Sequence, residues 1–95
     1  MHVISKKKLR EFYAKPADAE EPLLAWHRTV SKASWRTLND VRNSFPSADL
    51  VGNQTVFNIK GNHHRLIAHI RYESQTIFIR HVLTHAEYSR NTWKQ

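Results

Sequence analysis

The second half of the chain alternates hydrophobic and polar residues in the way expected of β-strands. Two such runs, 54–60 and 63–71, flank Gly61-Asn62, a dipeptide typical of tight hairpin turns. A two-residue turn at this point predicts four cross-strand pairs: Ile59 with His64, Asn58 with Arg65, Phe57 with Leu66, and Val56 with Ile67. A third run, 76–83, follows the polar break at 72–75. The pattern therefore predicts a three-stranded antiparallel meander.

The second turn of this meander decides which side chains share a face. A loop of two or four residues at 72–75 pairs Ile70 with Ile77, Ala68 with Ile79, Ile67 with Arg80, Leu66 with His81, and Arg65 with Val82. Because side chains alternate across a strand, one face becomes the core face. It receives Phe57, Ile59, Leu66, Ala68, Ile70, Ile77, Ile79 and Leu83, together with His64 and His81. The opposite face receives Asn58, Lys60, His63, Arg65, Arg80 and Thr84, together with Val56, Ile67, His69, Phe78 and Val82.

This assignment depends on the length of the second turn. A slip of one residue would move every side chain of the third strand to the other face and separate Arg65 from Arg80. The apolar pairing favours the register given above, because the alternative mixes core and polar residues.

The first half of the chain predicts a short strand and helices. The strand is 2–4, and Ser5 caps a first helix that ends near Lys15-Pro16. A second helix follows with Pro22 in its first turn, where the missing N–H costs nothing. The apolar stripes of these two helices consist of Leu9, Phe12 and Tyr13 in the first, and Leu23, Trp26, His27 and Val30 in the second.

Three further signals complete the expected order of elements. Thr37 can cap a short helix that Pro46 ends, and Gly52-Asn53 marks a turn into the strand that begins near Gln54. Thr84 and Glu87 have the spacing of a capping box, which predicts a final helix over about 85–92. We therefore expect one α+β domain over residues 1–95. Its antiparallel sheet would combine the C-terminal meander with an N-terminal strand, backed by two N-terminal helices and followed by a short C-terminal helix.

Composition and charge narrow the range of possible partners and sites. The 95 residues carry a formal net charge of +7, which favours a polyanionic partner such as nucleic acid. The absence of cysteine excludes disulfides and thiolate metal sites. The sequence shows neither a signal peptide nor a run long enough to cross a membrane, so we expect a cytoplasmic protein with no membrane contact.

The basic residues of the meander suit RNA binding and cleavage. Lys60, Arg65 and Arg80 would attract phosphate, and arginine binds phosphate oxygens through a bidentate fork. RNA cleavage also needs a base for the ribose 2′-hydroxyl and an acid for the leaving 5′-oxygen, and histidine titrates in the useful range. The candidates are His63 and His85, and also His64 or His81 if the register slips. Tyr88 could relay a proton or stack on a base.

Each of these residues also has a structural interpretation. Arg65 and Arg80 could be solvated sheet residues or could pair with Glu73 and Glu87. Glu87 is better explained by the capping box than as a general base. The histidines could suggest a metal site, but the alternating faces scatter them and no carboxylate joins them at ligand spacing.

The motifs of the second half resemble those of a known family. Phe57-Asn58-Ile59-x-Gly61-Asn62-x-x-Arg65-Leu66-Ile67, Tyr72-Glu73, Phe78-Ile79-Arg80 and Thr84-His85-Ala86-Glu87-Tyr88 closely resemble HigB-type toxins of the RelE/ParE superfamily. The resemblance implies a type II toxin–antitoxin system, in which the toxin cleaves messenger RNA, usually in the ribosomal A site. It implies no metal or other cofactor, and products ending in a 2′,3′-cyclic phosphate and a 5′-hydroxyl. It also implies a HigA-type antitoxin with a helix-turn-helix domain, through which the complex would contact operator DNA.

The resemblance also suggests the residues of the site. Its motif positions are occupied by Asn62, Arg65, Arg80, His85 and Tyr88. Lys60 stands where such toxins often have glycine, and His63 and His64 occupy variable positions. We therefore expect a catalytic set of Arg65, Arg80, His85 and Tyr88, and RNA contacts from Lys60, Asn62, His63, Arg65 and Arg80.

Two other functions remain open at this point. The protein could be a non-catalytic ParE-like toxin that inhibits a protein target such as gyrase, in which case His85 and Tyr88 would be packing residues. It could also be a simple nucleic-acid-binding module, which the charge alone would favour.

Overall fold

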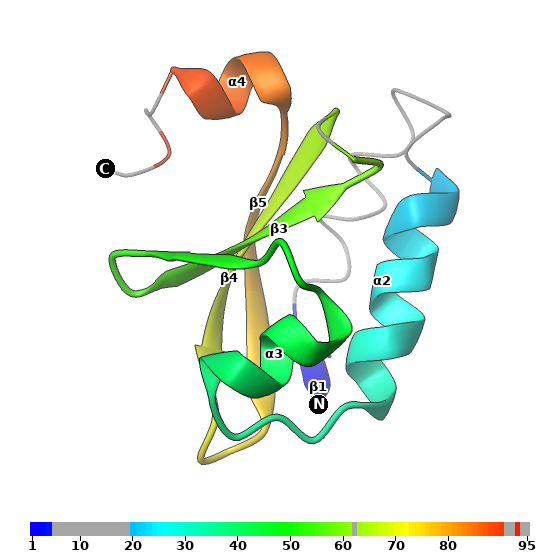
Figure 1. Ribbon diagram of the computed structural model, residues 1–95, viewed down its shortest axis with the longest axis vertical. Coiled ribbons are helices and arrows are strands. Elements are labelled where there is room, and N and C mark those ends of the chain that lie inside the picture. The colour runs from blue at the N-terminus through cyan, green and yellow to red at the C-terminus, as the bar shows by residue number, and fades with distance from the viewer. Residues whose placement is uncertain (5–19, 62, 91–92, 94–95) are drawn as a thin grey trace.

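A computed structural model describes residues 1–4, 20–61, 63–90 and 93, and shows an α+β fold (Figure 1). Within these residues the strands are β1 (His2–Ile4), β2 (Asp49–Val51), β3 (Gln54–Ile59), β4 (His64–Arg71) and β5 (Thr76–Thr84). The helices are α2 (Glu20–Lys32), α3 (Leu38–Ser44) and α4 (His85–Ser89). The first helix expected from the sequence, capped by Ser5 and ending near Lys15-Pro16, lies outside the described residues.

The described strands form one five-stranded sheet in the order β1-β5-β4-β3-β2. The expected α+β class is confirmed, but the sheet is mixed, because β1 runs parallel to β5 while the other neighbours are antiparallel. The sequence analysis also omitted β2. This strand pairs with β3 through the turn at Gly52, whose φ of 62° suits glycine. Arg42 of α3 forms an ion pair with β2, in which its Nη2 lies 3.4 Å from the Asp49 carboxylate.

The main core lies between the sheet and the helices α2 and α3. Phe57 is fully buried at its centre, and its ring centroid lies 5.4 Å from that of Trp26, 6.3 Å from that of Trp35 and 5.2 Å from that of Phe45. Edge-to-face and offset-stacked contacts of this kind stabilise aromatic cores beyond the area they bury. The core-face prediction is confirmed for Phe57, Ile59, Leu66, Ala68, Ile70, Ile77 and Ile79.

The β3–β4 hairpin has the predicted register. Ile59 pairs with His64, Asn58 with Arg65, Phe57 with Leu66, and Val56 with Ile67. In the turn, Lys60 has a φ of 53° and Gly61 a φ of 62°. Glycine adopts this left-handed region without strain whereas lysine does not, so the backbone explains why glycine would suit position 60.

The β4–β5 hairpin departs from the predicted register half-way along. Ile70 pairs with Ile77 and Ala68 with Ile79 as predicted, but a β-bulge at Ile67/Ala68 then inserts one extra residue into β5. Beyond the bulge the partners are Ile67 with His81, Leu66 with Val82, Arg65 with Leu83, and His64 with Thr84. The predicted pairs Ile67–Arg80, Leu66–His81 and Arg65–Val82 are therefore wrong.

The bulge exchanges the faces of the residues that follow it. Val82 packs against the main core, and Leu83 packs on the opposite face with Val56 and Ile67, which reverses the prediction for both. His81 also moves off the core face, because its partner is now Ile67. His64 stays on the core face and is buried, as predicted.

A capping box begins α4, as the sequence predicted. The Thr84 hydroxyl accepts a hydrogen bond from the Glu87 amide at 3.2 Å, and the Thr84 amide donates to the Glu87 carboxylate at 2.9 Å. These bonds satisfy two of the free N–H groups at a helix start. The helix ends at Ser89 with Arg90 as its C-cap, which is earlier than the expected end near 92, and residues 91–92 lie outside the described residues.

Thr84→Ala removes this cap and is expected to lower the free energy of unfolding by about 1 kcal/mol. Urea denaturation followed by circular dichroism measures the change. Thr29→Ala, at an exposed position of α2, serves as the control, since alanine is the better helix former and should leave stability equal or slightly higher. An unchanged midpoint for Thr84→Ala would mean that the capping box contributes nothing to the fold.

Candidate functional site

The sheet face opposite α2 and α3, here called the outer face, is covered at one end by the C-terminal segment. Tyr88 and Trp93 pack there in a second apolar cluster with Val56 and Ile67. Their rings are stacked, with centroids 5.2 Å apart and planes 15° apart, and the Trp93 indole N–H donates to the Tyr88 carbonyl at 3.0 Å. The other end of the outer face has no such cover from the described residues.

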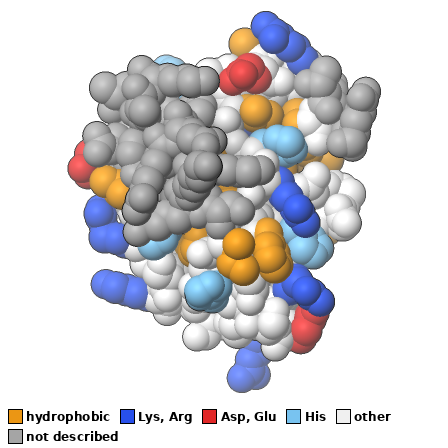
Figure 2. Space-filling model, turned by 180° about the vertical axis from the view of Figure 1, so that it is seen from behind, with side chains coloured by type: hydrophobic (Ala, Val, Ile, Leu, Met, Phe, Trp, Pro, Cys, Tyr) orange, Lys and Arg blue, Asp and Glu red, His pale blue; other side chains and the backbone are white. Residues whose placement is uncertain are grey.

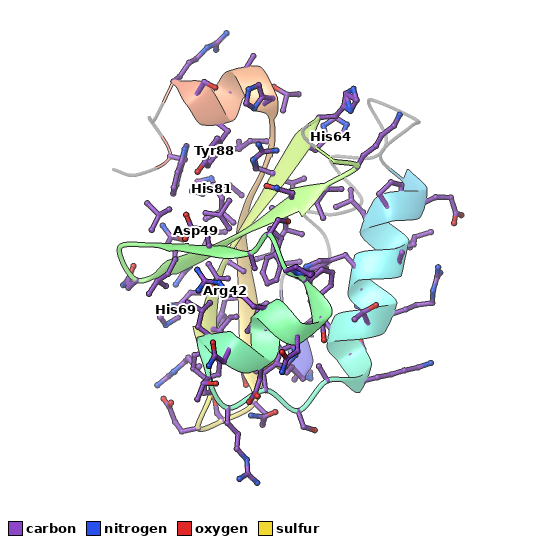
Figure 3. The ribbon with its side chains drawn as sticks, viewed as in Figure 1. Arg42, Asp49, His64, His69, His81 and Tyr88 are labelled. Carbon is purple, nitrogen blue, oxygen red and sulfur yellow. The ribbon has the colours of Figure 1, made fainter. Side chains whose placement is uncertain are left out.

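A groove of about 340 Å³ runs along the outer face where this cover ends. It is lined by Asn53, Gln54, His69, Arg80, His81 and Trp93. A second hollow of about 230 Å³ adjoins it and is lined by His81, Leu83, Glu87, Arg90 and Trp93. The two hollows share His81 and Trp93, so they lie side by side on the outer face. Figure 3 shows Tyr88, His81 and His69 on the side of the sheet away from α2.

The β-bulge determines what the groove contains. Arg80 is the extra residue of β5, and it is exposed on the outer face, where its guanidinium carbon lies 5.9 Å from the centroid of the Phe78 ring. The bulge turns His81 to the same side, so an arginine and a histidine that are adjacent in the sequence both line the groove. Without the bulge, strict alternation would place His81 in the core.

Arg65 lies on the outer face as predicted, but it is buried. Only 8% of it is exposed, and its guanidinium lies 5.3 Å from the centroid of the Tyr88 ring. Its Nη1 also donates to the His64 carbonyl at 3.1 Å. A desolvated cation–π contact of this kind is worth about 2 kcal/mol, so Arg65 helps to fix Tyr88 and α4 on the sheet.

The two arginines thus share a face but lie at different places on it. Arg65 pairs with Leu83, three residues beyond Arg80 on β5. At 3.3 Å per residue this separates them by about 10 Å along the strand. Arg80 faces the open groove, and Arg65 lies beneath the aromatic cover.

The remaining predicted residues gather beside α4. The His85 amide donates to the His63 carbonyl at 2.9 Å, and the His63 ring nitrogen Nδ1 lies 3.1 Å from the Lys60 carbonyl. All three side chains are exposed. The start of α4 and the β3–β4 turn therefore form one basic end of the outer face, while Asn62 lies outside the described residues.

Several residues that line the two hollows were not predicted from the sequence. His69, whose Nδ1 lies 3.3 Å from the Asn53 carbonyl, was placed on the correct face but given no role. Gln54, Arg90 and Trp93 were not considered as site residues. The alternating pattern could have suggested Gln54 and His69. Arg90 lines only the second hollow, from the end of α4, and Trp93 reaches both hollows because it packs back on the sheet.

The charge of the molecule suits a polyanionic ligand. On the face seen in Figure 2, Lys, Arg and His side chains lie on several sides of a small hydrophobic patch. In the described part of the chain, no three His, Cys, Asp or Glu side chains come together as a group that could hold a metal ion. No helix among the described residues is long and apolar enough to cross a membrane.

A mixed sheet with helices on one face and a basic, histidine-lined groove on the other is compatible with a RelE-like α+β fold. The chain belongs to the HigB toxin family: residues 19–91 match the family described as the RelE-like toxic component of a toxin–antitoxin system. The resemblance inferred from the motifs is therefore confirmed.

Curated relatives support the same family. The chain is 34% identical over 91 residues to the mRNA interferase toxin HigB of Escherichia coli, covering 93% of this chain and 88% of that protein. It has the same identity and coverage with the mRNA interferase HigB of Shigella flexneri. A second Escherichia coli mRNA interferase HigB is 30% identical over 95 residues, covering 97% of this chain and 92% of the relative.

Proposed function

We propose that this protein is an mRNA interferase, an endoribonuclease toxin that cleaves messenger RNA and thereby inhibits translation. Membership of the HigB toxin family and the names of the curated relatives support this activity. The observation that carries the proposal is the groove, in which Arg80 and His81 lie together on the outer face and which continues toward Arg90 and α4. The whole chain, 1–95, would act as a single RelE-like domain.

Arg80 would bind the phosphate group at which the RNA is cut. In the reaction, a base removes the proton of the ribose 2′-hydroxyl, the 2′-oxygen attacks phosphorus, and the bond to the 5′-oxygen breaks. The leaving 5′-oxygen takes up a proton, which gives a 2′,3′-cyclic phosphate and a 5′-hydroxyl. A fixed guanidinium stabilises the extra negative charge that develops on the phosphate oxygens in this step. Because Arg80 supplies that charge, we propose cleavage without a metal ion.

His85 and Tyr88 would supply the proton-transfer groups. They are three residues apart on α4, which brings their side chains to neighbouring positions of the helix surface. Arg65 would act by holding the Tyr88 ring and by adding positive charge beneath it. Lys60, Asn62 and His63 would extend the RNA contact along the basic end of the outer face.

His81 is the alternative proton-transfer group, because it lies beside Arg80 in the groove. Replacing His85 with glutamine is expected to lower the single-turnover rate of mRNA cleavage about 100-fold, because a positioned acid or base contributes at least that much. His81→Gln should reduce the rate less and act mainly on RNA affinity. The rates are measured with a 5′-labelled mRNA on programmed ribosomes. The reverse order of effects would assign proton transfer to His81.

The natural setting of the activity follows from the family. A toxin of this kind has an antitoxin partner, and we propose a HigA-type antitoxin with a helix-turn-helix domain. Contact with operator DNA would occur only through the antitoxin complex.

We further propose that cleavage requires translating ribosomes in the cytoplasm. The requirement for ribosomes is tested by comparing the cleavage of one mRNA when it is free and when it is bound to programmed ribosomes. A ribosome-dependent toxin leaves the free RNA intact.

A second candidate is a non-catalytic toxin of the ParE kind, which inhibits a protein target. The packing of Tyr88 between Arg65 and Trp93 favours it, because that interpretation makes Tyr88 a structural residue. Sequencing of transcript ends after toxin induction distinguishes the two. New 5′ ends inside messages support the interferase, whereas intact messages with a DNA-damage response support the ParE-like toxin.

A further inference from the structure

Three planar side chains stand next to one another on the outer face, at the end that the described part of the aromatic cover does not reach. Phe78 of β5 pairs with His69 of β4, and their ring centroids lie 6.3 Å apart with planes 33° apart. On the other side, the guanidinium carbon of Arg80 lies 5.9 Å from the centroid of the Phe78 ring. His69 and Arg80 also line the groove, so Phe78 lies next to two of its lining residues.

Phe78 differs in its packing from the other phenylalanine of the meander, Phe57. The Phe78 ring is only partly buried, and among the described residues it belongs to neither of the two apolar clusters. The other phenylalanine of the meander, Phe57, is fully buried in the main core. Phe78 is therefore partly accessible beside a cation, on a face whose charge suits RNA.

Open aromatic rings on a sheet face are a recurring way to bind single-stranded RNA. Bases stack on Phe, Tyr, Trp or His side chains and on arginine guanidinium planes, while basic groups hold the backbone. Phe78 and His69 supply rings on which a base could stack, and Arg80 supplies a guanidinium group, within one patch. The cation at the margin and the net charge of +7 make an RNA strand a better occupant than an apolar protein segment.

We propose that Phe78, together with His69, forms a stacking subsite for one nucleobase of the RNA strand whose phosphate is held by Arg80. This inference rests on the proposed function and specifies how that RNA is bound. Since every base has a stacking face, the subsite tolerates any sequence. It anchors the strand next to the cleaved linkage and leaves codon choice to other contacts.

The test measures the affinity of the protein for short RNAs with 2′-O-methyl groups, which the toxin cannot cleave by attack of the 2′-oxygen. Fluorescence anisotropy gives the dissociation constant for the wild type, Phe78→Leu and Phe78→Trp. Each protein is titrated with the intact RNA and with a series in which one base at a time is missing. Leucine keeps the apolar contact with the sheet but has no ring for stacking, and tryptophan enlarges the ring.

The expected result is a loss of about tenfold in affinity for intact RNA in Phe78→Leu, the size of one stacked base. Removing one particular base should weaken wild-type binding by the same factor and should not weaken Phe78→Leu further. Phe78→Trp should bind intact RNA at least as tightly as the wild type. This coupling between one side chain and one base is not expected of a residue that only stabilises the sheet.

Two outcomes would overturn the inference. One is an equal affinity of the wild type and Phe78→Leu for intact RNA. The other is a set of base deletions that affect all three proteins alike, which would make Phe78 an ordinary cross-strand partner of His69. If Phe78→Leu fails to fold, base deletions with the wild type and Phe78→Trp decide the matter. Cleavage of mRNA by the wild type is measured separately, so a failure of the proposed function is recognised independently.

Discussion

Replacing Arg80 with alanine is expected to lower the rate of mRNA cleavage by about two to three orders of magnitude and to abolish growth inhibition. The loss has the size seen when one fixed donor to a developing oxyanion is removed. Because Arg80 is exposed and is not one of the residues of the main apolar core, the variant should fold with the stability of the wild type. The rate is measured in a single turnover on programmed ribosomes, and the melting temperature is measured on the same samples.

Arg71→Ala is the matched control for this variant. Arg71 is also an exposed arginine, with 57% of its side chain accessible, and it follows His69 by two residues on the same strand and face. Its ion pair with Glu73, at 3.9 Å, is exposed and contributes little to stability. The control removes the same charge from the same face outside the groove, so cleavage should fall severalfold at most. Equal losses in both variants would show that general charge, and not the groove, determines activity.

Tyr88→Phe should separate the structural and chemical roles of the aromatic cover. Phenylalanine keeps the ring that stacks on Trp93 and faces Arg65, so the melting temperature should stay unchanged. The variant loses only the hydroxyl, and if that group donates or relays a proton, cleavage falls by about 100-fold. Single-turnover cleavage and thermal unfolding of the same preparation provide the two measurements.

Tyr72→Phe is the corresponding control, since it removes a tyrosine hydroxyl at the opposite end of the β4–β5 hairpin. Burial, and then the negative charge of Asp40, raise the pKa of Tyr72, so this hydroxyl stays protonated at neutral pH. Its removal should leave cleavage unchanged. If Tyr88→Phe also cleaves at the wild-type rate, Tyr88 is a packing residue and the proton must come from a histidine.

Local chemistry explains why part of the fold could be predicted from the sequence. The β3–β4 register follows from the turn at Gly61 and from the alternation on either side of it, both of which are encoded within a few residues. The start of α4 follows in the same way from Thr84 and Glu87, which cap the helix by themselves.

The bulge in β5 could not be predicted in this way. One extra residue exchanges the faces of everything after it, and the residues concerned, Val82 and Leu83, are both apolar and fit either face. Their order therefore gives no signal for or against a bulge. The bulge nevertheless shapes the candidate site, because it brings His81 beside Arg80 in the groove.

The burial of Arg65 was missed for a different reason. Strand alternation correctly placed this side chain on the outer face. It does not indicate which residues cover the side chain there. The cover comes from Tyr88 and Trp93, more than twenty residues later, when the chain returns across the sheet. Contacts of this kind depend on the path of the whole chain, which local patterns do not specify.

The central claim is that RNA binds to the outer face of the sheet, along the groove that contains Arg80 and His81. Titration of the isotope-labelled protein with a 2′-O-methyl RNA, followed by amide chemical shifts in NMR spectra, tests it most directly. The account predicts shifts at His69, Arg80, His81 and along α4, with little change in α2. The exposed side of α2 carries a competing basic surface, in a hollow lined by Ala25, Arg28, Thr29 and Lys32. Shifts confined to that helix, with the outer face unchanged, would contradict the account.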